Sequence, residues 1–507
     1  MRPRTTSLPL SLLHLLPEDL LLFVLSSLST RDLGSLSASS RALRGAIESV
    51  VRSRLAAAGL STPPQPRPAE SALAALLRAE RRRSVERSAV ATGAWHSLFI
   101  DAEEQLLSCG VEAVPGLAPR SGLLGHGPLQ RPGRGVIVPT PVAALSGVCI
   151  RSVAASTHLS LAVSWSGAVY AWGQFAPKPR ETCFAFPQQL IPVRVGGELR
   201  GVRVRGVAAG HAHALAWSED GALFSWGYGS HEHTAGGTTG GMLGHGDMRD
   251  VLVPKLVCAL DPRATHHRVV HCAAGELHSL AVTASGALFS FGDHAFGQCG
   301  HGPGGFGPVL GQHFLLPTRV AALAQLRVTN ASAGDRHSMC VTDEGAVFSW
   351  GTAWSGATLG LLARANEVVH SPRRIVAFDG IRVRSVSAGA WAQSFAISAE
   401  GEVYSWGLNN YAALGHGDDD KRCLPTRVEA LRGVRVRHLA ASLSHAIAVA
   451  YDGAWCWGSG AHGMVGLEGS PGDACVGLVR EGLGSGGIEQ ARPRRYPQQL
   501  RLSCAPA

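Results

Sequence analysis

The stretch "VRVRGVAAGHAHALAWSEDGALFSWG", residues 202–227, recurs along the chain in recognisable copies. Each copy joins an A-x-G-x-x-H block to an end of the type G-A-L-F-S-W-G. With two weaker copies that start at 89 and 149, the repeat is present seven times. The glycine that ends each copy stands at 110, 173, 227, 292, 351, 407 and 458, so the period varies from 51 to 65 residues. Periods of this size are typical of propellers and solenoids.

Apolar residues alternate with period two inside each copy, as Ala222, Phe224 and Trp226 do, which predicts strands and not helices. Each copy supplies about four short strands, which is one propeller blade. A small sheet cannot bury both faces alone, so we expect seven blades to pack face to face and close into a ring. The predicted fold class is therefore mainly β, with a seven-bladed propeller over residues 89–505.

Two kinds of residue recur at fixed places and are interpreted as structural. The aromatic residue near the end of each copy is expected to fill the gap between blades. These aromatic residues are Trp172, Trp226, Trp350, Trp406 and Trp457, with phenylalanine at 291. The histidines of the A-x-G-x-x-H block are His96, His213, His278, His337 and His445, with Leu159 and Gln393 at that place in copies two and six.

A second set of histidines belongs to an L-G-H-G element downstream of the repeat end. Its members are His126, His245, His301 and His416. A residue copied in separate blades lies on a ring far wider than a coordination sphere, so we expect hydrogen bonds and not metal ligation. The strings "HAH" at 211 and "HEH" at 231 are interpreted in the same way, and no metal or cofactor is expected.

The sequence contains no motif that indicates a catalytic site. Two G-x-G-x-x-G strings, "GPGGFG" at 302 and "GLGSGG" at 482, do not open a helix after a strand, and the chain holds 62 glycines, so they indicate no dinucleotide site. The phosphate-loop, H-E-x-x-H and G-x-S-x-G motifs are absent from the sequence. We therefore expect no catalytic residues and a protein that is not itself an enzyme.

Residues 14–56 follow a helical period instead. Pro17 suits a first helical position, and Val24 and Leu28 belong to an apolar stripe. The string "STRD" is a capping box for a second helix, and a third is expected to bury Leu43 and Ile47. Three short helices form a small core that generally needs a partner; the alternative is a helical cap packed on the propeller. Residues 57–88 are interpreted as a proline-rich linker and a basic helix.

Bulk properties limit the class of protein. The composition, 45% hydrophobic and 16% charged over 507 residues, is that of a folded chain. No apolar run reaches about 18 residues, so no membrane partner is expected. Eleven cysteines without zinc or disulfide spacing favour a cytoplasmic and/or nuclear location. The net charge of +9 permits an acidic or nucleic-acid partner, but the arginines that carry it are spread along the chain.

The copies differ most after their W-G ends, where extra residues accumulate. The insertions cover 174–190, 228–241, 303–313 and 467–492. Insertions at one point of every repeat emerge on one face of a disc, which is often its binding face. Arginines also alternate with valine or isoleucine on one strand of three copies, at 203, 205, 382, 384, 435 and 437. Either an edge strand kept soluble by charge or an anion-binding ring accounts for them.

The A-x-G-x-x-H, G-x-L-F-x-W-G and L-G-H-G elements, in this order, resemble the repeats of the regulator of chromosome condensation family. The resemblance implies a seven-bladed propeller whose ring is sealed by pairing the chain ends in one blade, and "RRYPQQLRL" at 494–502 is the expected sealing strand. Copy one departs from the pattern with Glu104 in place of glycine, and copy two lacks the L-G-H-G element.

The segment "LPEDLLLFVLSSLSTRDLGSLSASSRAL" resembles an F-box, which implies binding to a Skp-type adaptor and a cullin scaffold. Ser39 and Leu43 stand where that family prefers valine and tryptophan. The resemblance implies that the adaptor is bound by Leu16, Pro17, Leu20, Val24, Leu28, Leu33 and Leu36.

Taken together, the two resemblances imply a non-catalytic substrate receptor of a ubiquitin ligase, whose propeller binds an unidentified protein. The alternative is a guanine-nucleotide exchange factor for a small GTPase, or a chromatin-binding propeller. An ultraviolet sensor is disfavoured, because only "GAWHS" at 93 and "GAWAQS" at 389 approach the G-W-R-H-T motif of that branch.

Overall fold

The chain divides into two compact units, Met1–Arg87 and Ser88–Ala507. Each is considered by itself. A computed structural model describes residues 25, 33, 43–57, 89–101, 103–111, 122–127, 136–173, 189–211, 213–232, 238–303, 313–390, 392–450, 453–459, 464, 478–480 and 498–500.

The first unit contains the helix α3 (Arg44–Ala57), so the third helix predicted from sequence is confirmed. Leu43 lies just before it, and Ile47 donates its backbone N–H to the Leu43 carbonyl at 3.0 Å. Both side chains are buried, and the opposite side of the helix carries the exposed ion pair between Arg52 and Glu48 at 2.6 Å. This division between a buried and a charged side is that of a helix packed against a core.

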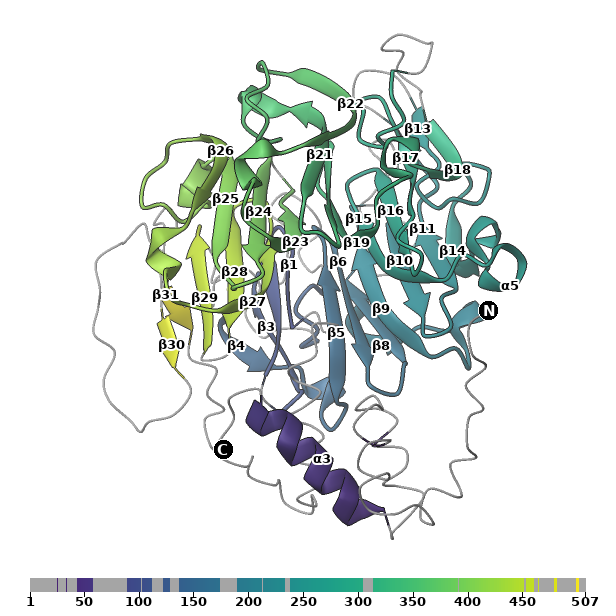
Figure 1. The fold of residues 1–507 in the computed structure, drawn as a ribbon. Coiled ribbons are helices and arrows are strands. Elements are labelled where there is room, and N and C mark those ends of the chain that lie inside the picture. The colour runs from purple at the N-terminus through teal and green to yellow at the C-terminus, as the bar shows by residue number, and fades with distance from the viewer. Residues whose placement is uncertain are drawn as a thin grey trace. The chain divides into compact units, whose positions relative to one another are not determined.

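The second unit is a ring of seven antiparallel sheets that follow one another in chain order, as the colours of Figure 1 show. The innermost strands are β1 (Val90–Thr92), β5 (Ile150–Ala155), β9 (Val204–Ala209), β15 (Val269–Ala274), β19 (Val328–Ala333), β23 (Val383–Ala388) and β27 (Val436–Ala441). The second strands are β2 (His96–Ile100), β6 (Leu159–Ser164), β10 (His213–Ser218), β16 (His278–Thr283), β20 (His337–Thr342), β24 (Gln393–Ser398) and β28 (His445–Ala450).

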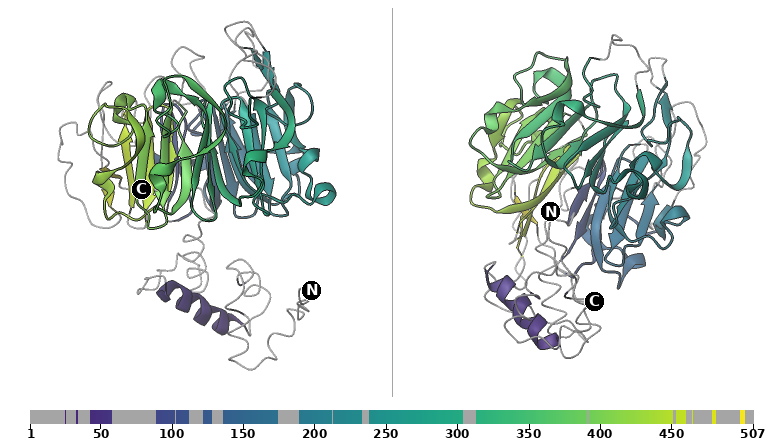
Figure 2. Two further views of the ribbon diagram at one scale, coloured as in Figure 1. Left: turned by 45° about the horizontal axis from the view of Figure 1, so that its top comes forward. Right: turned by 45° about the vertical axis from the view of Figure 1, so that its right-hand side comes forward.

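The third strands carry the recurring aromatic residue, and the fourth strands lie on the rim. The third strands are β3 (Leu106–Gly110), β7 (Val169–Gly173), β11 (Leu223–Gly227), β17 (Leu288–Asp293), β21 (Val347–Ala353), β25 (Val403–Gly407) and β29 (Gly453–Gly458). The fourth strands are β4 (Val136–Pro141), β8 (Gln189–Arg194), β14 (Val251–Leu256), β18 (His313–Arg319), β22 (Glu367–Arg374), β26 (Arg422–Arg427) and, in blade 7, β31 (Gln498–Leu500) with β30 (Leu478–Arg480). Figure 2 shows the sheets from two further directions. The predicted fold class is confirmed.

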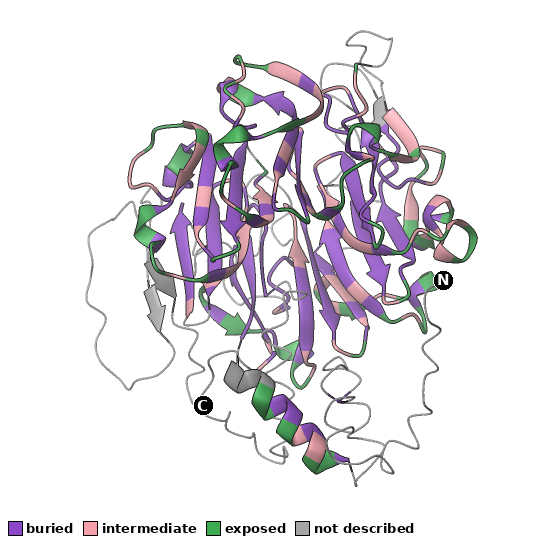
Figure 3. Cartoon of the chain, in the orientation of Figure 1, coloured by how far each residue is buried: buried purple, intermediate pink, exposed green. Residues whose placement is uncertain are grey.

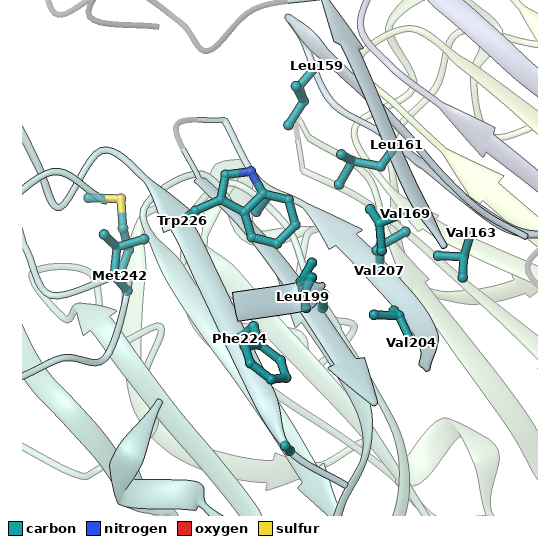
Figure 4. Close-up of a cluster of buried hydrophobic side chains, with 14 of the residues drawn as sticks. Leu159, Leu161, Val163, Val169, Leu199, Val204, Val207, Phe224, Trp226 and Met242 are labelled. Carbon is teal, nitrogen blue, oxygen red and sulfur yellow. The ribbon is translucent and has the colours of Figure 1, made fainter. Parts of the chain in front are cut away.

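Each junction between neighbouring blades has its own apolar core, including the junction between blades 7 and 1. The second strands show how one sheet serves two cores. Ala214 and Ala216 of β10 face blade 2, whereas Leu215 and Trp217 of the same strand face blade 4. Figure 4 shows the core between blades 2 and 3, with Trp226 against the strands of blade 2. Because side chains alternate along a strand, each sheet contributes apolar side chains to the cores on both of its faces. This allows the seven blades to close into a ring.

The closure differs from the expectation drawn from family resemblance. The strand β31 does pair with β29, but β29 belongs to the same last repeat. Blade 1 is likewise built from consecutive strands, β1 to β4. Within the described residues, no sheet therefore combines the two ends of the propeller. The ring is instead sealed by side-chain packing, in which Phe99 of blade 1 contacts the apolar cluster of Ile447 in blade 7.

The rim strands are the least buried parts of the propeller, whereas the second and third strands are buried almost throughout (Figure 3). Six rim strands carry a proline, at positions 139, 192, 254, 317, 372 and 425. Proline cannot donate a ladder hydrogen bond, so it blocks pairing of an exposed edge with another chain. Two further strands, β12 (Ser230–Glu232) and β13 (Thr238–Gly240), form a separate hairpin within the insertion that follows β11.

Candidate interaction site at the axial end of the propeller

The two recurring sequence elements meet at one end of each sheet. In blade 3, His213 at the start of β10 pairs with Gly227 at the end of β11. The same register joins His278 to Gly292 and His337 to Gly351. The turns between the first and second strands and the insertions after the W-G ends therefore lie on one face of the disc, here named the turn face.

The histidines of the repeat bond across the junctions to serines of the next blade. The bonds from histidine Nε2 to serine Oγ are His96 to Ser160 at 2.7 Å, His213 to Ser279 at 2.8 Å, His278 to Ser338 at 2.8 Å, His337 to Ser394 at 3.2 Å and His445 to Ser97 at 2.9 Å. All five histidines are buried. The last of these bonds joins blade 7 to blade 1, so the hydrogen bonds follow the ring through its closure.

The direction of these bonds fixes the protonation of the imidazoles. Ser160 donates its hydroxyl hydrogen to the Leu123 carbonyl at 3.0 Å, so His96 must donate Nε2–H to the serine oxygen. Nδ1 of His96 is buried and has no hydrogen-bond partner among the described residues. Burial lowers the pKa of His96, His213, His278 and His445 to about 3 and that of His337 to about 4. The histidines are therefore neutral at physiological pH.

Two junctions lack the bond, and both partners are missing together. Blade 2 has Leu159 at the histidine position, and blade 3 has Ala214 at the serine position that would face it. Blade 6 has Gln393, and blade 7 has Ala446 opposite it. Gln393 donates instead to the Leu443 carbonyl at 3.0 Å. At the Leu159 and Ala214 junction, replacing both members of the pair leaves no polar group without a partner, so the loss of the hydrogen bond costs little stability. At the other junction, Gln393 Oε1 is buried without a partner among the described residues.

The L-G-H-G loops bond within and between blades. The imidazole of each loop lies 2.8–3.0 Å from a serine of its own third strand. The loop carbonyls accept from the next blade: the Gln298 carbonyl receives both Ser338 Oγ and Trp350 Nε1, each at 2.8 Å. A Cβ on Gly300 would lie 2.7 Å from Trp350 Nε1, so only glycine fits there. The aromatic residues predicted to be structural, Trp172, Trp226, Trp350, Trp406 and Trp457, all lie buried at junctions.

A cavity of about 350 Å³ is lined by the turns of all seven blades, which places it on the axis of the ring at the turn face. The residue after the turn glycine, or after the serine that replaces it, lines the cavity in every blade, and six different residue types stand at these seven positions. These residues are Ala94, Thr157, His211, Glu276, Asp335, Ala390 and Leu443. The elements that repeat thus build the junctions, while the positions that vary line the cavity.

The acidic side chains of this cavity come from neighbouring turns in blades 4 and 5. Glu276 donates its backbone N–H to the Gly334 carbonyl at 3.2 Å, so it lies beside Asp335. Oδ1 of Asp335 is buried without a hydrogen-bond partner among the described residues. Burial raises the pKa of Asp335 to about 6, although Arg336 acts in the opposite direction. The guanidinium of Arg336 is held over the Phe296 ring at 4.1 Å, so it does not pair with the carboxylate.

The loops that follow the third strands of blades 5 and 6 add exposed apolar side chains to the turn face. Trp354 and Leu362 follow the end of β21 and are 38% and 69% exposed. Tyr411 follows β25 and is 61% exposed. The guanidinium carbon of Arg336 also lies 5.2 Å from the centre of the Trp354 ring. This contact places Trp354 near the turn that carries Asp335. Aromatic residues that stay exposed beside a cavity are common at recognition sites.

On the opposite face, arginines at the start of the innermost strands hold the neighbouring blade. Arg327 donates to the Ala284 carbonyl at 2.8 Å, and Arg382 donates to the Asp343 carbonyl at 2.7 Å. The same position is occupied by Arg203, Arg268 and Arg435. The sequence reading singled out 203, 382 and 435 but missed 268 and 327, because these two do not alternate with a second arginine. Of the alternating partners, Arg384 bonds to the Val436 carbonyl at 2.9 Å.

The junction of blades 1 and 2 departs from this arrangement. Glu104, where five other copies have glycine, has a φ of 62° and is 2% exposed, and its Oε1 has no hydrogen-bond partner within the part of the chain that the structure describes. A Cβ on Gly286 would lie 2.4 Å from Arg327 Cγ, so glycine is required where arginine follows. Blade 2 has Cys149 in place of that arginine, and the shorter side chain leaves room for Glu104.

The remaining predicted residues are only partly covered by the structure. Leu33 is buried and helical, as is Leu25. The other adaptor-binding positions, Leu16, Pro17, Leu20, Val24, Leu28 and Leu36, lie outside the described residues, as do residues 58–88 and most of the insertions. In the described part of the chain, no group of three or more His, Cys, Asp or Glu side chains is placed to hold a metal ion. Nor does any described helix have the length and apolarity to cross a membrane.

The comparisons with known proteins agree with this geometry. Residues 56–429 match the RCC1-like domain, and the chain belongs to that family of propellers. A second match, to the F-box domain, covers residues 13–54. The propeller extends past the matched region, because blade 7 begins at Val436.

Two relatives are similar in sequence. The Ultraviolet-B receptor UVR8 of Arabidopsis thaliana is 31% identical over 324 residues, which are 63% of this chain and 67% of that protein. The E3 ubiquitin-protein ligase HERC2 of Homo sapiens is 32% identical over 340 residues. That match covers 66% of this chain but only 6% of HERC2.

Two solved structures share the fold. Prp20p of Saccharomyces cerevisiae superposes with a TM-score of 0.56 at 24% identity, over 70% of this chain and 80% of that one. Human WBSCR16 gives a TM-score of 0.57 at 21% identity, over 72% and 87%. At these identities the likeness shows the propeller fold alone.

Proposed function

We propose that this protein is a non-catalytic substrate receptor of a Skp-cullin-F-box ubiquitin ligase. In this proposal, residues 14–56 bind the Skp-type adaptor, residues 57–88 act as a linker, and the propeller over 89–505 holds the protein that is to be modified. The observation that carries the proposal is that an F-box match and an RCC1-like match follow each other in one chain. One module suits attachment to the ligase and the other suits recognition.

The structure of the propeller supports a binding role over a catalytic one. The histidines of its A-x-G-x-x-H blocks form hydrogen bonds between blades, and burial keeps these imidazoles neutral. The recurring tryptophans are likewise buried at the junctions. A general base needs a pKa near the operating pH and access to a substrate, and these side chains have neither. The turn residues that line the axial cavity, in contrast, are of six different types in the seven blades, and six of the seven are at least partly exposed.

The cysteines are consistent with action in the cytoplasm and/or the nucleus. Five of the eight cysteines among the described residues are buried, and the eleven cysteines of the sequence follow neither zinc nor disulfide spacing. Such cysteines are usual in reducing compartments, where the ubiquitin ligases assemble.

Affinity capture tests the proposal. The tagged full chain is expected to retain a purified Skp-type adaptor, and a form lacking residues 1–56 is expected to lose it while still retaining the partners of the propeller. A full-length double variant, Leu20→Asp with Val24→Asp, places charge on the predicted adaptor-binding stripe and should lower retention at least tenfold. Arg52→Ala, which removes an exposed ion pair of α3, is the matched control.

Two results would count against the proposal. If neither the full chain nor the truncated form retains adaptor or cullin, the ligase role is wrong. If the purified propeller instead accelerates nucleotide release from a small GTPase, an exchange factor is the better description.

A further inference from the structure

The axial cavity combines a size suited to a ligand with an acidic wall. Its volume of about 350 Å³ falls in the range of about 300–1,000 Å³ that is common for ligand sites. Most of its lining is alanine, glycine, serine or threonine, so the space is not filled by the protein's own side chains. Among the described residues that line it, none is lysine or arginine.

The carboxylates of this wall are not held by an ion pair among the described residues, although the charge of Arg336 acts to lower the pKa of Asp335. Glu276 and Asp335 come from neighbouring turns that share a backbone hydrogen bond. The guanidinium of Arg336 is stacked on Phe296 and Trp354 at 4.1 and 5.2 Å, and Asp335 Oδ1 is buried without a hydrogen-bond partner in the described part of the chain. A buried carboxylate without a partner is costly to the protein, and an incoming cation would remove that cost.

The surroundings favour a cation that is part of a polypeptide. Trp354, Leu362 and Tyr411 remain exposed on the same face, on the side of the ring that carries Asp335. Flanking residues of an extended segment would cover these side chains while its central side chain enters the cavity. Overall charge does not explain such binding, because the chain carries +9 and repels a basic peptide as a whole. Attraction must therefore come from the local carboxylates.

We propose that the cavity binds a lysine or arginine side chain presented by an extended segment of the target protein, with Glu276 and Asp335 pairing with its cationic group. Trp354, Leu362 and Tyr411 contact the residues on either side of it. This inference rests on the proposed function, since it names the class of segment that the receptor recognises.

Peptide retention on the immobilised full chain tests the proposal. The probe is a pool of capped nonapeptides with arginine or lysine fixed at the centre and Ala, Leu, Ser or Tyr at the other positions. The matched pool has glutamine at the centre. We expect at least tenfold greater retention of the arginine and lysine pools. The double variant Glu276→Gln with Asp335→Asn should reduce that retention at least tenfold.

The control removes the same charge from the opposite face. Asp343 and Glu344 are exposed in the turn between β20 and β21, so Asp343→Asn with Glu344→Gln should leave retention unchanged. A further variant, Thr157→Arg, supplies a cation inside the cavity and should block the peptides even though both carboxylates remain. Thermal unfolding of each variant checks that the propeller is intact.

The proposal is overturned if the glutamine pool is retained equally, if the opposite-face control loses as much as the cavity variant, or if the cavity variants retain the peptides. Adaptor capture by the same variants separates this inference from the proposed function. Selective retention of cationic peptides without adaptor capture would leave the cavity as a binding site and reject the ligase role. Adaptor capture without selective retention of cationic peptides would support the ligase role and reject the cavity as a binding site for them.

Discussion

Two neighbouring junctions of the propeller solve the same packing problem differently. Between blades 3 and 4, His213 bonds to Ser279, and that serine in turn donates to the Met242 carbonyl at 2.9 Å. Between blades 2 and 3, Leu159 and Ala214 stand at the corresponding positions and both lie in an apolar core. The fold accepts either arrangement, provided that both partners change together.

The comparison shows that the polar links between blades are matched pairs and not isolated preferences. A buried imidazole opposite alanine would lack a partner, and a serine opposite leucine would lose one of its hydrogen bonds. The links are therefore scaffolding, while the turn residues next to them change freely from blade to blade. Two predictions use this difference between linked and unlinked junctions, and a third concerns the unusual backbone at the junction of blades 1 and 2.

The largest effect is expected from acid. Below pH 6.5 the unfolded chain takes up protons on its histidines, but the folded propeller does not protonate the five linking histidines until about pH 3 to 4. Stability is therefore fully present above pH 6.5 and falls as the pH decreases, by up to about 1.4 kcal/mol per pH unit for each group. Burial also lowers the pKa of His158 and His301 to about 4, which adds to the loss of stability in acid. Asp335, whose pKa is raised to about 6, acts in the opposite direction but is a single group.

Urea unfolding of the full chain between pH 7.5 and 4.5, followed by tryptophan fluorescence, measures this slope. We expect a steep loss of stability across that range. A variant with one linked junction made apolar, His213→Leu with Ser279→Ala, should show a shallower slope because it has one buried histidine fewer. A stability that is flat between pH 6.5 and 4.5 would contradict the neutral, buried imidazoles.

The second prediction breaks one link. His213→Leu alone deprives Ser279 of its donor and should lower the free energy of unfolding by about 1–2 kcal/mol. In a cycle with Ser279→Ala, the two changes should couple by roughly 1 kcal/mol, measured by denaturant unfolding at pH 7.5. The converse change at the unlinked junction, Leu159→His, should be destabilising and partly rescued by Ala214→Ser. Strict additivity in both cycles would show that the links are not energetic pairs.

The smallest effect concerns the junction of blades 1 and 2. Glu104→Gly removes a left-handed non-glycine residue and a buried carboxylate oxygen without a partner, and should raise the free energy of unfolding by about 1 kcal/mol. Glu103→Gly next to it is the control, because Glu103 has no left-handed backbone and glycine there should be neutral or destabilising. A destabilised Glu104→Gly protein would mean that the carboxylate has a favourable role.

Much of the fold was predictable because the evidence for it is repeated. Seven copies of an alternating pattern required strands, and strands with two apolar faces required neighbours on both sides. The third helix of the N-terminal unit followed from the spacing of Leu43 and Ile47. The sealing of the ring was not predictable, because the sequence of 494–502 indicates a strand but not the blade in which that strand pairs.

The sequence by itself determined that a propeller follows a short helical segment, since periodicity and motif spacing are properties of the chain alone. That the helical segment is an F-box came from its resemblance to that family and from the family match over residues 13–54. Only the tertiary structure decided what the repeated histidines do, because their serine partners lie in the following blade, about 60 residues or more away along the chain. It also decided that Glu276 and Asp335 share one cavity. Each is a single varied letter in its own repeat, and closure of the ring is what brings the seven turns together around the axis.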